Sequence, residues 1–123
     1  MTKRRATLHP PPGLSLMITF DEFMKIELRV AEVKEVLDHP NASKLYILKV
    51  DAGEGELRQL VAGLKPYMTP DKLLGKKIVI VANLEPATLR GEVSQGMLLA
   101  AEHEGHVTIL TPAEDLPPGS MVR

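Results

Sequence analysis

Three short polar segments of this chain carry side chains that could contact the phosphate and ribose oxygens of a nucleic acid. The first holds an amide at Asn41 and an ammonium group at Lys44. The second offers the guanidinium group of Arg90, which suits a bidentate contact with phosphate. The third contains the hydroxyl of Ser94 and the thioether of Met97. Each segment alone fits ordinary turn chemistry, but together they indicate a contact surface for nucleic acid.

The signals for catalysis or metal binding are poor. His103 and His106 are three residues apart, but a Glu-Gly turn separates them and no third ligand is evident, so we expect a solvated turn. Ser94 lacks the strand–turn–helix context of a hydrolase nucleophile. The glycines match neither a phosphate-binding P-loop nor a dinucleotide fingerprint. We therefore expect no catalytic residue, no metal and no cofactor, and an enzyme is the third choice among the functional classes.

The amino-acid composition excludes several classes of protein and of binding partner. The chain has 123 residues, of which 44% are hydrophobic and 25% charged, and this suits one domain with a real core. Fifteen Lys and Arg against sixteen Asp and Glu exclude a general polycation, although they permit a local basic face. Two Phe, two Tyr and no Trp cannot supply a row of stacking platforms for single strands. No apolar run approaches the roughly 18 residues of a membrane span, and cysteine is absent.

The elements that must position these side chains are short strands. Residues 1–18 are basic and proline-rich, which predicts an arm or linker before a domain over residues 19–123. Thr19 and Glu22 fit a capping box at the start of a short helix. Later strands are expected at 45–50, 57–62, 76–82, 97–101 and 107–110, with a short helix over 69–75 and an irregular segment from Pro112.

The first strand is predicted to be long and bent. Ile26, Leu28 and Val30 alternate with charged residues and share one face. The alternation then changes phase, and one extra residue near Ala31–Glu32 would restore it as a β-bulge. The element order is therefore three strands, a short helix and two or three more strands. It predicts an all-β protein, a five-stranded Greek-key barrel of the oligonucleotide-binding (OB) fold with short helices and an irregular C-terminal extension.

At these motifs the sequence resembles the tRNA-binding domain family, which occurs at the C-terminus of methionyl-tRNA synthetases, in phenylalanyl-tRNA synthetase β subunits and as free-standing proteins. The resemblance covers residues 20–123, with the motifs in the family's order. They are His39 to Leu45, Val61 to Leu64, Gly75 to Lys77, Asn83-Leu84 with Pro86, Leu89 to Gly91, and Ser94 to Met97.

The resemblance implies an OB-fold module that binds tRNA by shape, without catalysis and without selecting one amino-acid identity. It assigns the tRNA-facing surface to Asn41, Lys44, Arg90, Ser94 and Met97. Three further candidates rest on their charge alone: Arg29, Lys34 and Lys49. The implied partners are tRNA and a methionyl-tRNA synthetase catalytic chain. The expected location is the cytoplasm. Whether the chain is free-standing, a β subunit or an appended domain stays open.

A homodimer is expected for two reasons. The methionyl-synthetase-like members of the family are dimers, and a small barrel leaves strand edges and an apolar tail to cover. The expected interface residues lie in that tail: Leu110, Leu116, Met121 and Val122.

The sequence also departs from the family. Glu85, Ala87 and Thr88 stand where many members carry basic residues, and Ala62 replaces a frequent serine. Fewer cations predict a flatter salt dependence of tRNA binding, by about 0.7 to 0.9 in slope for each phosphate that is no longer neutralised, unless the basic arm compensates. The alternative function is a dimeric, peptide-binding export chaperone of the same fold family, whose members generally lack the Ser-Gln-Gly-Met sequence.

Overall fold

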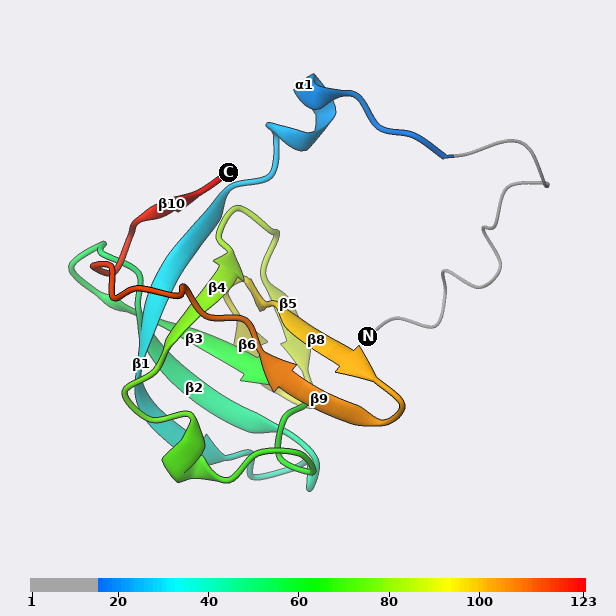
Figure 1. Cartoon of the computed structure of the whole chain (residues 1–123). Coiled ribbons are helices and arrows are strands. Elements are labelled where there is room, and N and C mark those ends of the chain that lie inside the picture. The colour runs from blue at the N-terminus through cyan, green and yellow to red at the C-terminus, as the bar shows by residue number, and fades with distance from the viewer. Residues whose placement is uncertain (1–15) are drawn as a thin grey trace.

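The structure, a computed structural model, describes residues 16–123 and is almost entirely β-structure (Figure 1). The barrel strands are β1 (Leu28–Asp38), β2 (Tyr46–Asp51), β3 (Leu57–Ala62), β4 (Lys77–Val81) and β7 (Met97–Leu98). The other elements are α1 (Phe20–Phe23), η2 (Pro70–Lys72), β5 (Ala87–Leu89), β6 (Glu92–Ser94), β8 (Ala100–His103), β9 (His106–Ile109) and β10 (Met121–Val122). The expected arm, residues 1–18, lies outside the described residues except for its last three.

The main sheet has the strand order β3-β2-β1-β4-β7, with antiparallel neighbours. Its two edges meet, because the N–H of Gln95, just before β7, donates to the carbonyl of Gln59 in β3 at 2.7 Å. η2 stands between β3 and β4. This order and closure confirm the predicted all-β, five-stranded barrel of the OB type.

β1 is long because it serves two ladders. Its first half pairs with β4 and its second half with β2, and the register shifts between Val33 and Glu35. The bulge is therefore real but lies later than the predicted Ala31–Glu32. Ala31 and Val33 belong to the buried core cluster, whereas Val30 is buried but does not belong to it. The alternation of core and outward residues therefore continues through Ala31–Glu32, and the extra residue comes after Val33.

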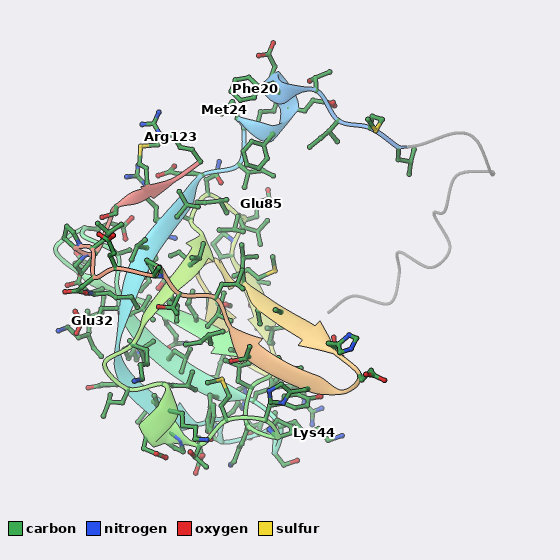
Figure 2. All side chains as sticks on the ribbon, viewed as in Figure 1. Phe20, Met24, Glu32, Lys44, Glu85 and Arg123 are labelled. Atoms are coloured by element: carbon green, nitrogen blue, oxygen red, sulfur yellow. The ribbon has the colours of Figure 1, made fainter. Side chains whose placement is uncertain are left out.

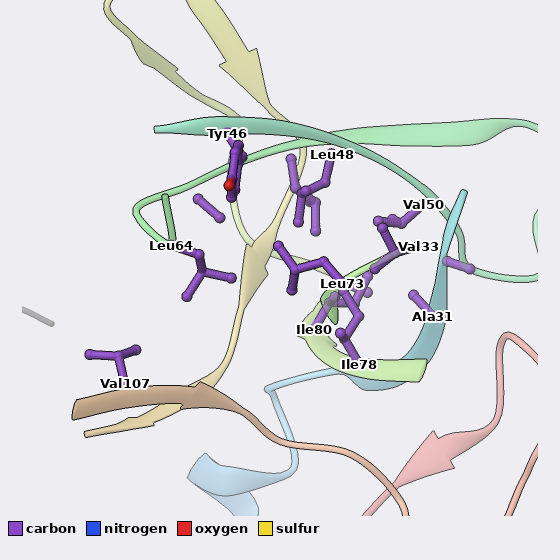
Figure 3. Close-up of a cluster of buried hydrophobic side chains, with 14 residues drawn as sticks. Ala31, Val33, Tyr46, Leu48, Val50, Leu64, Leu73, Ile78, Ile80 and Val107 are labelled. Carbon is purple, nitrogen blue, oxygen red and sulfur yellow. The ribbon is translucent and has the colours of Figure 1, made fainter. Parts of the chain in front are cut away.

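The core fills the inside of this barrel (Figure 3). Leu48, Leu60, Ile78 and Ile80 come from four inward-facing strand positions and are fully buried. Leu73, which follows η2, is also fully buried, so this short connection contributes to the core. Burial of each such side chain stabilises the fold by roughly 1.5–3 kcal/mol.

Both predicted helices are single turns. At α1, the N–H of Glu22 donates to Thr19 Oγ1 at 3.0 Å and the N–H of Thr19 to Glu22 Oε1 at 2.8 Å, which confirms the capping box. The second helix is the 3₁₀ turn η2, shorter than expected, and the Thr69 side chain makes no capping hydrogen bond to it.

Three features of the second half were not predicted. Residues 87–94 form the hairpin β5–β6, where a loop was expected. The predicted strand 97–101 is divided at Leu99. Its first part, β7, pairs with β4 in the barrel, and the N–H of Leu99 still donates to the carbonyl of Val79 in β4. Its second part, β8, forms a separate hairpin with β9. The C-terminal extension is not wholly irregular, because β10 pairs with the start of β1.

Gly96 provides a test of the barrel closure. Its φ is +124°, and an added Cβ would lie 2.8 Å from the carbonyl oxygen of Val81. We expect Gly96→Ala to lower the free energy of unfolding by about 2–4 kcal/mol, because both the backbone conformation and the contact are unfavourable. Gly105→Ala is the matched control, since Gly105 also has a positive φ but nothing near its Cβ position. An equal loss in both variants, measured by urea unfolding, would contradict the close packing at Gly96.

Candidate nucleic-acid interface

The loop 39–45 joins β1 to β2 at one end of the barrel, where Figure 2 shows Lys44. Asn41 and Lys44 are exposed, whereas His39 is buried. The N–H of Asn41 donates to His39 Nδ1 at 2.9 Å, which makes a tight turn. The loop is thus folded around a buried imidazole and presents its polar side chains outward.

The hairpin β5–β6 brings Arg90 to the same place. Arg90 and Gly91 form its two-residue turn with φ values of 54° and 94°, as in a type I′ turn, which suits the twist of a hairpin. The tip of this hairpin, residues 89–91, contacts the loop 39–45. His39 Nε2 lies 2.9 Å from the carbonyl oxygen of Leu89, and Asn41 Nδ2 lies 3.4 Å from that of Arg90.

Three predicted residues therefore meet in one shallow depression of about 550 Å³. Its lining residues are Asn41, Ala42, Ser43, Lys44, Leu45 and Arg90.

The charges around this depression also bear on what it can bind. Among residues 16–123, five other cations are paired with carboxylates, namely Arg29, Lys34, Arg58, Lys65 and Lys77. Within residues 16–123, neither Lys44 nor Arg90 has a carboxylate at ion-pair distance. Two unpaired cations with an amide between them can take up phosphate oxygens without first breaking an ion pair.

The other two residues of the predicted set lie elsewhere. Ser94 is buried, and its hydroxyl accepts from the N–H of Val61 at 3.0 Å and donates to the carbonyl of Gly96 at 2.9 Å. Both bonds lie within the protein, so the structure gives Ser94 a structural role. Met97 is 42% exposed and lines a separate, largely apolar groove with Tyr67. Gly63 belongs to that groove, and its Cβ position is 3.8 Å from the Leu45 side chain of the depression, so the two features adjoin.

The three candidates chosen by charge do not join the depression. Arg29 donates to Glu27 at 2.8 Å and to the carbonyl of Gly119 at 3.0 Å, so it anchors the C-terminal segment. Lys34 is exposed on the bulge of β1 and lies 3.5 Å from Glu32. Lys49 donates to Gln59 Oε1 at 2.6 Å across β2 and β3.

The acidic β2–β3 hairpin projects away from the depression. It leaves the barrel at the Asp51–Leu57 end of these strands, whereas the loop 39–45 enters at the Tyr46–Ala62 end. Arg58 donates to both carboxylate oxygens of Glu54, at 2.8 and 2.7 Å, and this bidentate bond lowers the pKa of Glu54 from its usual value. The same bond raises the pKa of Arg58, whose guanidinium group also donates to the carbonyls of Ala82 and Gln95.

The residues expected at a dimer interface are accessible. Leu110, Leu116 and Met121 are exposed, and Val122 is half-buried in a groove that Met121 and α1 also line. Figure 2 shows Phe20, Met24 and Arg123 around this region, at the opposite end of the molecule from Lys44.

His103 and His106 face each other across the β8–β9 turn, and His103 is paired with Glu104 at 3.0 Å. Within residues 16–123, no group of three or more His, Asp or Glu side chains is placed to hold a metal ion. In the same part of the chain, no helix is long and apolar enough to cross a bilayer.

Sequence reasoning missed His39 as an individual site residue. It belongs to the recognised motif, but its type gives no sign that the ring is buried and links two segments that lie 50 positions apart. The available signal was its place two residues before Asn41, where a side chain often accepts a backbone hydrogen bond in a turn.

A small closed barrel with unpaired cations on the loops at one rim defines the class of oligonucleotide-binding β-barrels. The family described as "Putative tRNA binding domain" matches residues 28–121. The chain belongs to this tRNA-binding domain family.

Similar proteins agree with this assignment. Methionine–tRNA ligases of Pyrococcus furiosus and Thermococcus kodakarensis are 56% and 55% identical over 106 residues, which cover 86% of this chain and 14% of each ligase. Among solved structures, a MetRS-related protein of Pyrococcus horikoshii has a TM-score of 0.81 and 38% identity, covering 87% of this chain and 98% of that one. The CsaA chaperone protein of Picrophilus torridus has a TM-score of 0.80 and 34% identity, covering 87% and 100%.

The Glu54–Arg58 pair predicts a pH-dependent contribution to stability. Because folding lowers the pKa of Glu54, the ionised carboxylate stabilises the fold above the pKa of the unfolded chain, and this contribution is lost as the pH falls below about 5. Glu54 is half-exposed, so we expect Glu54→Gln to cost less than about 1 kcal/mol at pH 7 and almost nothing at pH 3. Urea unfolding at both pH values measures the difference.

Glu56→Gln is the control on the same hairpin, since Glu56 makes no hydrogen bond or ion pair among the described residues. A cost for Glu54→Gln that stays constant between the two pH values would show that the ion pair is not its source.

Proposed function

We propose that this domain is a non-catalytic module that binds folded tRNA by shape through the depression between the loop 39–45 and the tip of the β5–β6 hairpin. The observation that supports it most directly is the pair of unpaired cations, Lys44 and Arg90, which two separate elements bring to one surface. Membership of the tRNA-binding domain family supplies the class of ligand.

Within this proposal each residue has a distinct part. Lys44 and Arg90 bind phosphate oxygens, and Asn41 and Ser43 supply neutral hydrogen bonds beside them. Met97 offers a packing contact at the adjoining groove. Ser94 acts indirectly, because its buried hydroxyl holds β6 against β3. Such contacts read the path of the backbone, which suits a chain that has few aromatic side chains.

The synthetase relationship suggests how such a module is used. The chain spans 14% of the length of the methionine–tRNA ligases it matches, so any aminoacylation would belong to a synthetase body, in the same polypeptide or in a partner. A tethered module raises the local concentration of tRNA at such an enzyme. We propose this accessory role in the cytoplasm, whether the domain is free-standing, a β subunit or an appended part.

The residues that depart from the family lie outside the depression. Glu85, Ala87 and Thr88 are exposed along the connection from β4 into β5, and Figure 2 shows Glu85 well away from Lys44. An acidic residue here adds no phosphate contact. We therefore propose that few phosphates are neutralised and that the affinity depends strongly on Lys44 and Arg90.

The second candidate function is binding of an extended peptide, as the likeness to the CsaA chaperone protein suggests. The apolar groove with Tyr67 and Met97 is the observation that favours it. Titration against folded tRNA, single-stranded RNA and an unfolded polypeptide separates the two. A salt-sensitive preference for folded tRNA supports the first function, and its absence together with polypeptide binding supports the second.

Removal of either cation should weaken tRNA binding. A charge-assisted contact is worth about 1.5–3 kcal/mol, so we expect Lys44→Ala and Arg90→Ala each to raise Kd roughly tenfold or more and to reduce the salt slope by about one. Fluorescence anisotropy at several salt concentrations measures both. Lys72→Ala removes another exposed charge, outside the depression, and should change Kd much less. Wild-type binding by both Lys44→Ala and Arg90→Ala, with the fold intact, would rule out this surface.

We also propose that the domain forms a homodimer through the groove between α1 and β10. Exposed apolar residues gather there, including Phe20, Met24 and Met121, and an isologous contact would cover them on both copies. Leu110 and Leu116 would extend the contact along the C-terminal segment.

A point substitution tests the dimer better than truncation, because Gly119 and Ser120 bond to Val30 and their loss would disturb the barrel. We expect Met121→Asp to convert a dimer into a monomer of 13.5 kDa in sedimentation equilibrium at micromolar concentration. Leu57→Asp is the control, since Leu57 is equally exposed but lies on β3 at the acidic hairpin. A wild-type protein that is already a monomer would contradict the proposal.

A further inference from the structure

We propose that His39 is a positioning residue for RNA binding: its buried imidazole fixes the tip of the β5–β6 hairpin so that Arg90 lies beside Lys44. This inference rests on the proposed function for its consequence in tRNA binding, but its structural part can be measured on the free protein. It assigns a binding role to a side chain that is itself only 5% exposed.

Both ring nitrogens of His39 are occupied, and their partners determine the tautomer. The N–H of Asn41 can only donate, so Nδ1 accepts at 2.9 Å. The carbonyl of Leu89 can only accept, so Nε2 carries the proton and donates at 2.9 Å. One neutral ring therefore closes the turn of its own loop and also holds the neighbouring hairpin.

The hairpin has little else to hold its tip. All three residues of β5 are exposed, as are Arg90 and Gly91, so the hydrophobic core does not fix this end. The β6 strand of the hairpin is attached to β3, where Gln59 Nε2 donates to the carbonyl of Val93 at 2.9 Å and to Glu92 Oε1 at 3.2 Å. An isolated two-stranded hairpin is marginally stable in water, so the tip depends on its local contacts.

Among the described residues, two side-chain hydrogen bonds reach the carbonyls of Leu89 and Arg90, and they differ in quality. The bond from His39 to Leu89 has good length and comes from a buried ring. The contact from Asn41 Nδ2 to the carbonyl of Arg90 is 3.4 Å long and exposed. His39 is therefore the main attachment of the tip on its β5 side.

The backbone conformation of Arg90 is the reason why this attachment matters for the position of its guanidinium group. Arg90 has a φ of 54°, a left-handed conformation that L-residues other than glycine, asparagine and aspartate adopt infrequently. When the tip is released, the turn can relax and the guanidinium group loses its fixed place opposite Lys44. A residue in such a conformation persists where its surroundings determine it, and such residues gather at binding sites.

Two substitutions separate the two bonds of the ring. In His39→Asn the amide oxygen can still accept from the N–H of Asn41, as in an Asx turn, but the shorter side chain does not reach Leu89. In His39→Gln the longer amide can still donate toward Leu89 while the turn acceptor is lost. The first variant therefore releases the hairpin, and the second is the conservative rescue.

The binding experiment is a double-mutant cycle in tRNA affinity. In the wild-type background we expect Arg90→Ala to raise Kd about tenfold, and in His39→Asn less than about threefold, because Arg90 no longer contributes there. Lys44→Ala should cost about tenfold in both backgrounds. His39→Gln should restore most of the effect of Arg90→Ala. An equal cost of Arg90→Ala in all backgrounds would overturn the proposal, and melting curves show whether each variant is folded.

A measurement on the free protein keeps the two proposals distinguishable. Backbone NMR order parameters at Leu89, Arg90 and Gly91 should fall in His39→Asn and recover in His39→Gln, while the similar turn at Glu104–Gly105 stays unchanged in each as an internal control. If the tip remains ordered in His39→Asn, His39 does not position it. If the tip is released but Arg90→Ala never affects binding, the positioning is correct and the proposed tRNA surface is wrong.

Discussion

Closure of the barrel along the edge of β3 is the constraint on which the rest of this structure depends. The N–H of Gln59 donates to the side-chain oxygen of Gln95 at 2.8 Å, and that of Val61 to the hydroxyl of Ser94 at 3.0 Å. Both donors would otherwise stand on a free edge, which invites pairing with another chain. Two side chains thus take the place of a regular strand partner, because β6 and β7 are too short to cover the whole edge.

This way of closing the barrel explains the position of the candidate binding residues. Because β6 is attached to β3 by side chains at its end, the preceding residues are free to leave the barrel as a hairpin and to carry Arg90 to the loop after β1. The candidate interface therefore rests on polar contacts outside the core. Ser94 and Arg90 lie on the same hairpin, but Ser94 is buried and Arg90 is exposed.

The barrel strands were predictable because they carry alternating side chains, as the start of β1 does, or a short apolar run, as β4 does, between turn residues. β5 carries no such pattern, since Ala87, Thr88 and Leu89 are all exposed, and β10 is only two residues long. In the site, Lys44 and Arg90 could be chosen from their chemistry together with the recognised motifs.

The burial of individual polar side chains and their hydrogen-bond partners could not be predicted from the sequence. The hydroxyl of Ser94 has the same sequence signal whether it meets RNA or the edge of β3. The engagement of Arg29 with Gly119 joins positions 90 residues apart, which no local pattern reports.

The two proposed surfaces lie at opposite ends of the molecule, and this separation bears on assembly. Lys44 lies at one end, whereas Phe20, Met24 and Arg123 lie at the other (Figure 2). β1 runs between them, since its first residues pair with β10 and its last residues lead into the loop 39–45. Association through the α1 and β10 end would leave each depression uncovered, so a dimer could present two of them to RNA. Because both surfaces are attached to one continuous strand, their separation is set by the barrel itself and not by a flexible linker.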